Sequence, residues 1–326
     1  MSALEMNDKE QKLEELLNDD ISLETGEDNV NEDIDEANEE YQVYSGEALN
    51  SQEIYQIAAK ENMKMLFIVG PTASGKTTME TTLYQLFQRG AVGSFYFAGS
   101  NTLQGFEQRA FYTRVMSKGS VPDTPRTSLE SNQSFLHLRL WQYKRDIINN
   151  FVFADLSGEN FESHIGQVEK SKETFSFLRR ADYIIGVLDC EKLIDKKNFQ
   201  STVSQMIRLL RTFYDAELID EACVLQLVFS KYDLVVKNTN SEQLINKAKQ
   251  IINSSLNEMY PNIEFYNVAA MPKVVGEYNV GYGLKELLES WIENRTYLNS
   301  NKKEEPFDSF SEFDKLSIKF KGDINE

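Results

Sequence analysis

The segment MKMLFIVGPTASGKTTMETTLYQLFQ, residues 63–88, constrains the fold of this chain more than any other stretch. It begins with an apolar run, passes through a turn that contains two glycines, and continues with a pattern typical of an amphipathic helix. The turn matches G-x-x-x-x-G-K-[ST] at Gly70, Gly75, Lys76 and Thr77. Strand, glycine loop and helix in this order form the context in which that pattern binds phosphate.

The chemistry of this loop follows from its backbone and from two side chains. The backbone N–H groups that residues 71–78 carry, which all of them except Pro71 have, are expected to converge on phosphates at the start of a helix, whose dipole also favours anions. Lys76 is expected to reach the outer phosphates and the Thr77 hydroxyl to bind Mg²⁺. The predicted phosphate-binding residues are Gly70, Thr72, Ala73, Ser74, Gly75, Lys76, Thr77 and Thr78.

Charge separates the first 50 residues from the rest of the chain. Residues 1–50 hold seventeen acidic and two basic residues, which accounts for a net charge of −15 out of −18 for all 326 residues. The high acidity of this segment and its few apolar residues predict a disordered tail. A segment that binds a partner is the alternative. Residues 51–299 are predicted to form one globular domain, and residues 300–326 a polar tail with spaced aromatic residues.

Composition also narrows the location and the chemistry. There is no uninterrupted apolar run of about 18 residues and no basic, apolar leader, which predicts a cytoplasmic protein without membrane insertion. Cys190 and Cys223 lie far apart in apolar runs, which favours buried reduced thiols over a disulfide or zinc site. The acidic balance argues against a nucleic-acid partner.

Strand and helix patterns alternate along the domain, which predicts an α/β fold with a mostly parallel sheet. FLHLRLW and DIINNFVFAD are so close in sequence that they can pair only as antiparallel strands, so one antiparallel strand is expected, at the sheet edge. Residues 161–180 are predicted to be helical. The stretch 91–134 is predicted to be a long insertion that ends in a loop containing two prolines.

A second motif follows the predicted hairpin. FVFADLSGE is an apolar strand that ends in Asp155, where a carboxylate can hold Mg²⁺ beside the phosphate loop through water. Gly158, three residues later, lets a backbone N–H group approach the terminal phosphate.

A third motif, SKYD, ends the later strand VLQLVFS. The carboxylate of Asp233 can accept hydrogen bonds from N1–H and the 2-amino group of guanine, whereas adenine offers no such pair of donors. Lys231 is expected to lie across the base plane. NVAAMP ends the last strand with small residues, so that a backbone N–H at Ala270 can contact guanine O6.

Together, GPTASGKT, DLSG, SKYD and AAM resemble the Ras-like branch of the translation-factor-type (TRAFAC) GTPases across residues 63–297. SNTLQGFEQRAFYTR, TPRTS, FLHLRL and DLSGENF are similar to the bacterial double-GTPase family of predicted conflict systems. The resemblance implies a three-layer P-loop NTPase sandwich. It also implies Mg²⁺-dependent binding and hydrolysis of GTP to GDP, which switches the state of a protein partner.

The motifs depart from the Ras-like pattern at two positions. Ser230 stands where Asn or Thr is usual, which predicts a weaker brace on the phosphate loop. Glu159 follows Gly158 where Ras-like enzymes carry the glutamine that orients the attacking water, so slow hydrolysis or another catalytic residue is expected. His164 is a candidate for that role, although a single histidine there is more often a surface residue.

The switch threonine of such enzymes should precede the first hairpin strand. TPRTS offers Thr124 and Thr127, and Thr127 is favoured as the residue that senses the terminal phosphate and Mg²⁺ because it lies nearer the strand. Arg126 can serve as an arginine finger within the same chain, or it is a solvated loop residue.

Two other functions fit parts of the sequence. Because Glu159 replaces the water-orienting glutamine, the chain can instead be a scaffold that holds GTP or GDP without turnover. The sequence GPTASGKT also resembles the phosphate loop of transferases that prenylate tRNA. Such enzymes carry an acidic residue after the next strand, and AGSNTLQGF lacks it.

Overall fold

The computed structural model of the protein describes residues 44–111, 134–155, 158–235, 239–273 and 277–292. The folded unit begins at Tyr44. Its strands are β1 (Met63–Val69), β2 (Phe95–Gly99), β3 (Ser134–Gln142), β4 (Ile147–Asp155), β5 (Tyr183–Asp189), β6 (Val224–Ser230) and β7 (Ile263–Asn267). Its helices are α2 (Ser51–Lys60), α3 (Lys76–Arg89), α4 (Leu103–Ala110), α5 (Gly158–His164), α6 (Val168–Thr174), η3 (Ser176–Arg180), α7 (Cys190–Ile194), α8 (Phe199–Asp215), η4 (Tyr232–Leu234), α9 (Thr239–Leu256) and α10 (Leu284–Ser290).

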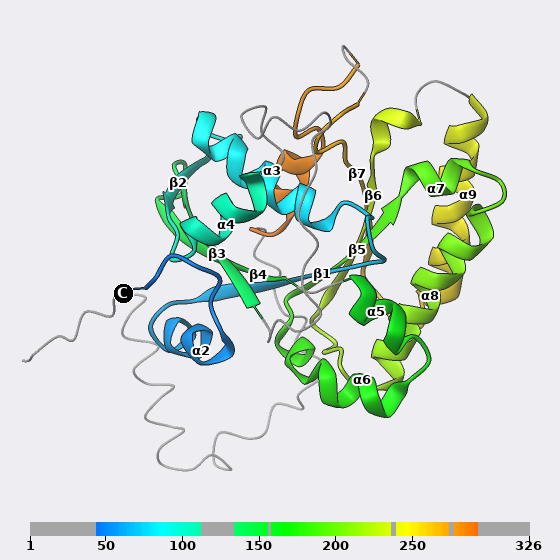
Figure 1. Ribbon diagram of the computed structural model, residues 1–326, viewed down its shortest axis with the longest axis horizontal. Helices are drawn as coiled ribbons and strands as arrows, with labels where there is room; N and C mark the ends of the chain where they lie inside the picture. The colour runs from blue at the N-terminus through cyan, green and yellow to red at the C-terminus, as the bar shows by residue number, and fades with distance from the viewer. Residues whose placement is uncertain (1–43, 112–133, 156–157, 236–238, 274–276, 293–326) are drawn as a thin grey trace, which may run out of the picture. The chain divides into compact units, whose positions relative to one another are not determined.

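The described strands form a seven-stranded sheet in the order β2-β3-β4-β1-β5-β6-β7 (Figure 1). β1 pairs in parallel with β4 and β5, and the parallel pairing continues through β6 to β7. β3 runs antiparallel to β4, from Ser134 opposite Asp155 to Gln142 opposite Ile147. The prediction of a mostly parallel α/β sheet with one antiparallel strand is therefore confirmed.

The antiparallel strand does not lie at the edge of the sheet, where it was predicted. β2 pairs antiparallel with the outer side of β3, with Phe95 opposite Gln142, and so forms the edge itself. The short connection between β3 and β4 determines only the direction of β3 relative to β4. The partner on the other side of β3 comes from an earlier part of the chain, which local spacing does not reveal.

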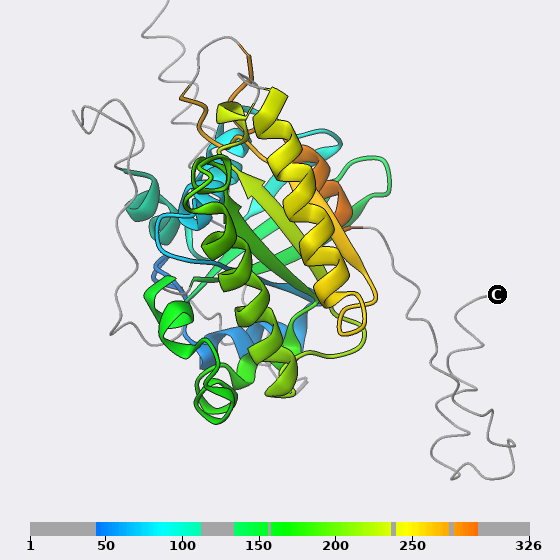
Figure 2. The same ribbon diagram turned by 90° about the vertical axis from the view of Figure 1, so that its right-hand side faces the viewer.

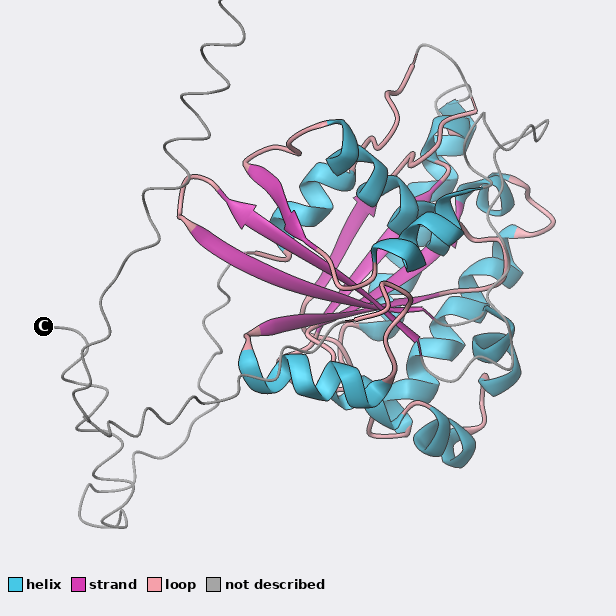
Figure 3. Cartoon of the chain, turned by 60° about the vertical axis from the view of Figure 1, so that its left-hand side comes forward, coloured by secondary structure: helices cyan, strands magenta, loops and turns pink. Residues whose placement is uncertain are grey.

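Helices cover both faces of the sheet, as Figures 2 and 3 show. On one face, α3, α4 and α10 pack on apolar residues such as Leu66, Leu138 and Phe153. On the other face, α2, α5, α8 and α9 pack on a second cluster that includes Phe67 and Leu227. Because β1 is covered on both faces, its sequence is apolar apart from Lys64, as expected for a central parallel strand. The three-layer architecture agrees with the expected fold.

The region 161–180 is not one helix. α5 ends at His164, and Gly166 follows with φ 78°, a left-handed conformation that interrupts the helix. α6 and the 3₁₀ helix η3 then complete the connection to β5. Helical periodicity predicted the correct secondary structure class, whereas the interruption depends on the single glycine.

Residues 44–50, which the sequence analysis placed in the acidic tail, pack as part of the folded unit. Leu49 is only 2% exposed and forms a bridge with Phe135 of β3. The Asn50 side chain caps α2 by accepting from the N–H groups of Gln52 and Glu53. The folded domain therefore starts before residue 51, because the few apolar and capping residues of this segment have partners far away in the sequence.

A chain that begins at Ser51 is expected to be less stable than one that begins at Tyr44. The shorter chain loses the Asn50 cap and the burial of Leu49, which together contribute about 3 kcal/mol. Thermal unfolding of the two chains, with the full-length protein as the reference, measures the difference. Equal melting temperatures for the Ser51 and Tyr44 chains would show that residues 44–50 do not contribute to the fold.

Candidate nucleotide-binding site

The loop between β1 and α3 follows a path that two of its glycines permit. A Cβ atom on Gly70 would lie 2.7 Å from the carbonyl oxygen of Val187 in β5. Gly75 has φ 98° and is the N-cap residue of α3, so a side chain there would be strained. The backbone therefore turns tightly at the carboxyl end of the sheet, where the start of α3 faces the loop.

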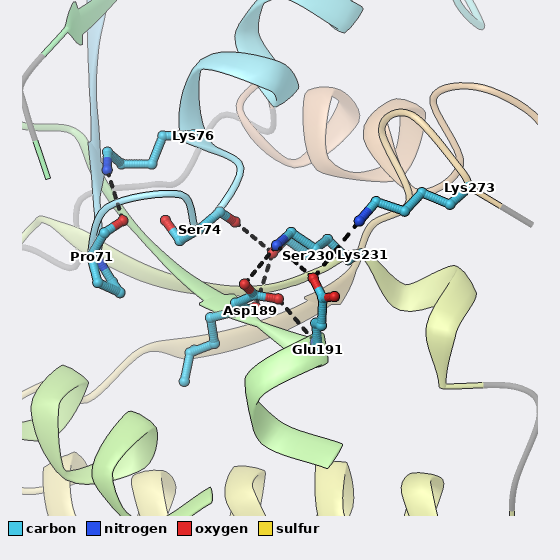
Figure 4. A network of polar contacts seen from close by, with 9 residues as sticks. Pro71, Ser74, Lys76, Asp189, Glu191, Ser230, Lys231 and Lys273 are labelled. Atoms are coloured by element: carbon cyan, nitrogen blue, oxygen red, sulfur yellow. Dashed lines mark hydrogen bonds and ion pairs between the residues drawn. The ribbon is translucent and has the colours of Figure 1, made fainter. Parts of the chain in front are cut away.

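Lys76 begins α3 and extends back across this loop. Its Nζ atom donates hydrogen bonds to the carbonyl oxygens of Gly70 and Pro71, at 2.9 and 3.1 Å (Figure 4 draws the bond to Pro71). Thr77 and Thr78 follow in the first turn of α3. Among the described residues, the buried Thr72 Oγ1 and Ser74 Oγ atoms have no hydrogen-bond partner. These hydroxyls suit a polar ligand, because buried polar atoms are normally paired.

Ser230, at the end of β6, braces the loop. Its buried hydroxyl lies 2.6 Å from the carbonyl oxygen of Ser74 and 3.1 Å from that of Leu188. Serine therefore supplies the contact that the sequence analysis expected to be weakened at this position. The hydroxyl links the phosphate loop to β5 and β6, so the loop and the SKYD motif form one connected structure.

Lys231 is held by two carboxylates that the sequence analysis did not identify. Its Nζ atom lies 2.7 Å from Asp189 Oδ2 and 3.2 Å from Glu191 Oε2 (Figure 4). Burial opposes the charged form of Lys231, but the hydrogen bonds and charges of Asp189 and Glu191 outweigh it and raise the lysine pKa. The hydrogen bond from Lys231 in turn lowers the pKa of Glu191. The ion pair fixes the orientation of the lysine, which has the left-handed φ of 53°.

Asp233 lies in η4, directly after β6, and Ala270 follows the end of β7. Asp233 is 2% exposed, and its Oδ2 atom accepts a hydrogen bond from the backbone N–H of Lys273 at 2.9 Å. The N–H of Tyr232 donates to the carbonyl oxygen of Val268, which ties the SKYD turn to the chain that follows β7. The structure thus brings the SKYD and AAM segments together at one edge of the sheet.

Gly158 of the DLSG motif lies against the phosphate loop. β4, which ends at Asp155, pairs with β1. A Cβ atom on Gly158 would lie 2.5 Å from the backbone nitrogen of Thr72, so only glycine permits this approach. The same N–H group of Thr72 donates to Glu162 Oε1 at 2.9 Å. Glu162, which the sequence analysis missed, therefore contacts the loop.

The remaining candidates have different surroundings. Glu159 lies in the first turn of α5 and is partly buried. His164 is buried, which contradicts the expected surface position, and its two ring nitrogens contact the Asn160 carbonyl oxygen and the Thr174 hydroxyl. These contacts and the adjoining Phe175 ring give His164 a structural role. Thr124, Arg126 and Thr127 lie outside the described residues.

The two cysteines are buried and free, as predicted. Burial raises the pKa of Cys223 to about 12, and burial also raises the pKa of Cys190, so both remain thiols near neutral pH. No group of three or more His, Cys, Asp or Glu side chains within the described part of the chain is placed to hold a metal ion. None of the described helices is long and apolar enough to cross a membrane.

The sheet order, the loop that precedes α3 and the three motifs at the carboxyl edge define a Ras-like P-loop protein. The chain belongs to the Double-GTPase 2 family, whose model matches residues 64–292. The expected family is thereby confirmed, and membership supports GTP binding. No curated protein sequence matches this chain.

Solved structures of GTPase-type proteins show only distant similarity. The signal recognition particle receptor SRβ-GTP/SRX complex from Chaetomium thermophilum is 16% identical with a TM-score of 0.36, and the match covers 66% of this chain and 94% of that one. The GTPase-like domain of Ski7 from S. cerevisiae bound to GTP is 15% identical with a TM-score of 0.42, and the match covers 74% and 52% of the two chains.

Ser230→Ala is expected to destabilise the phosphate loop by about 1 to 3 kcal/mol, because two carbonyl oxygens lose the hydroxyl beside them. Chemical denaturation and titration with a guanine nucleotide should both detect the loss. Ser230→Thr, which retains the hydroxyl, is the matched control. The brace would be disproved if Ser230→Ala and Ser230→Thr had the same stability and affinity.

Proposed function

We propose that this protein binds GTP and GDP with Mg²⁺, hydrolyses GTP slowly and passes its nucleotide state to a protein partner. One observation carries the proposal. The phosphate loop, the SKYD turn and the DLSG glycine come from distant parts of the sequence, and they meet at the carboxyl edge of one sheet, where α/β proteins bind ligands.

The phosphate end of the proposed site consists of the loop and the start of α3. Its predicted ligands are the N–H groups of residues 72–78, with Lys76 on the outer phosphates. The Lys76 ammonium already lies across the loop, 3.1 Å from the Pro71 carbonyl oxygen. A positive charge at this place stabilises the charge that develops during phosphoryl transfer.

The base end consists of Lys231, Asp233 and Ala270. The backbone N–H of Lys273 holds one carboxylate oxygen of Asp233, which orients the side chain. Asp189 and Glu191 orient Lys231. We assign the selection of guanine to the Asp233 carboxylate and the contact across the plane of the base to Lys231. The backbone N–H of Ala270 is assigned the contact with guanine O6.

The residues at the phosphate end also suit a divalent cation. Thr77 lies in the first turn of α3, and Asp155 ends the strand beside β1. Hydroxyl and carboxylate oxygens are ligands that Mg²⁺ prefers, and Thr77, Asp155 and the switch threonine, Thr127, would hold the ion. The ion would neutralise charge on the outer phosphates during transfer.

We assign the hydrolysis of GTP to the positioning of the reacting groups rather than to a strong catalytic base. Gly158 allows α5 to lie directly against the loop at Thr72. Glu159 follows it, so the amide that orients water in Ras-like enzymes is replaced by a carboxylate that the terminal phosphate repels. Lys76 and the loop N–H groups then supply most of the stabilisation, which accounts for a low intrinsic rate.

A protein partner fits this chemistry. Stabilisation by an arginine from a partner contributes about 10³- to 10⁵-fold to the rate of GTPases in general, so a partner can control both the rate and the duration of the GTP state. No nucleic acid is required by the proposed site, because its ligand-facing groups match a single nucleotide.

Asp233→Asn is expected to weaken GTP binding by at least tenfold and to favour xanthosine triphosphate, whose 2-oxo group accepts a hydrogen bond from an amide. Titration of the wild type and the variant with GTP, ATP and xanthosine triphosphate measures the base preference. Equal binding of ATP and GTP by the wild type, or an unchanged GTP preference in the variant, would contradict the assignment.

The isolated protein is expected to hydrolyse GTP slowly in the presence of Mg²⁺, and Glu159→Gln is expected to raise the rate or leave it unchanged because it removes a repelled charge. Single-turnover phosphate release with excess enzyme measures both. Lys76→Ala serves as the inactive control. Release that never exceeds this control would favour a scaffold that binds nucleotide without turnover, and a large loss in Glu159→Gln would make the carboxylate a catalytic group.

A further inference from the structure

The peptide group that joins Pro71 to Thr72 is contacted from three directions. Its carbonyl oxygen accepts a hydrogen bond from Lys76 Nζ at 3.1 Å (Figure 4). Its N–H group donates to Glu162 Oε1 at 2.9 Å. Gly158 packs so closely that an added Cβ would lie 2.8 Å from the Pro71 carbonyl carbon. One peptide group therefore connects the phosphate loop, its lysine and α5.

Glu162 uses a donor of the type that such loops direct at phosphate. The N–H groups of a glycine-rich phosphate loop bind anionic oxygens, and the Thr72 N–H here binds a carboxylate oxygen. A carboxylate and a phosphate are both anions and use the same kind of donor. The two groups therefore compete for this part of the loop.

The position of Lys76 indicates which phosphate of a nucleotide competes with the Glu162 carboxylate. Lys76 is the residue that reaches the outer phosphates, and its ammonium lies against the same peptide group that Glu162 contacts. The Glu162 carboxylate therefore lies at the end of the loop that receives the terminal phosphate. A diphosphate, which lacks that group, leaves the contact between Glu162 and Thr72 intact.

We propose that Glu162 is a specificity-determining residue that favours guanosine diphosphate over guanosine triphosphate at this site. The inference rests on the proposed function, since it assumes that the loop binds a guanine nucleotide. A terminal phosphate either displaces the carboxylate or is repelled by it. Both effects weaken the binding of the triphosphate and leave the binding of the diphosphate unchanged. Glu159 is also a carboxylate beside this end of the loop, but the Thr72 N–H donates to Glu162, so Glu162 is the residue that competes with a phosphate for a loop donor.

Glu162→Gln separates charge from hydrogen bonding. The glutamine amide retains an oxygen that can accept from the Thr72 N–H, but it carries no charge to repel a phosphate. Glu162→Ala removes both the charge and the acceptor. Glu169→Gln is the matched control, because Glu169 is an exposed glutamate on the following helix, α6.

The dissociation constants of GDP and of a non-hydrolysable GTP analogue, the β,γ-imido triphosphate, are measured by calorimetry at a fixed Mg²⁺ concentration. Glu162→Gln is expected to raise affinity for the triphosphate about 3- to 10-fold relative to the diphosphate, a modest factor because the carboxylate is exposed. Glu162→Ala is expected to shift the ratio in the same direction. Glu169→Gln is expected to leave it unchanged.

A merely structural contact gives a different pattern. In that case Glu162→Gln would bind both nucleotides as the wild type does, and Glu162→Ala would weaken both equally; either result overturns the assignment of Glu162. A wild-type protein that binds neither nucleotide overturns the proposed function and this inference together. A wild type that binds both, with the same ratio in Glu162→Gln, overturns only the role of Glu162.

Discussion

The close approach of backbone segments around residues 70–72 is the constraint on which the rest of the site depends. Gly70 lies against the Val187 carbonyl oxygen and Gly158 lies against the Thr72 nitrogen, each at a distance that excludes a side chain. These two contacts place the loop against β5 on one side and α5 on the other. The position of Lys76, and hence of any phosphate that it binds, is fixed relative to both.

The motifs that are contiguous in sequence were predictable, because their geometry is local. The loop with its glycines, the β3–β4 hairpin and the strand ends at Asp155 and Ser230 all follow from spacing and periodicity. The contacts between motifs were not predictable. Lys231 and Asp189 are 42 positions apart, and Thr72 and Glu162 are 90 apart, so no local pattern connects them. Leu49 escaped notice for the same reason, since its partner, Phe135, belongs to β3.

The SKYD turn shows how three nearby residues acquire separate roles. The left-handed backbone at Lys231 turns the chain sharply between its neighbours. Ser230 contacts the phosphate loop, Lys231 contacts Asp189, and Asp233 accepts from the Lys273 N–H. The phosphate end and the base end of the proposed site are therefore joined through one short turn.

The anchoring of α5 determines what a displaced Glu162 can do. Phe161 packs on Phe175 and Phe213, and His164 contacts Thr174, so the buried side of this helix is fixed to α8, to α6 and to the residue between α6 and η3. Gly158 fixes its first turn against the loop. Since both ends are held, release of the exposed Glu162 side chain requires a change of its rotamer rather than detachment of the helix. A change in nucleotide state would then move the Glu162 carboxylate while the fold beneath it stays in place.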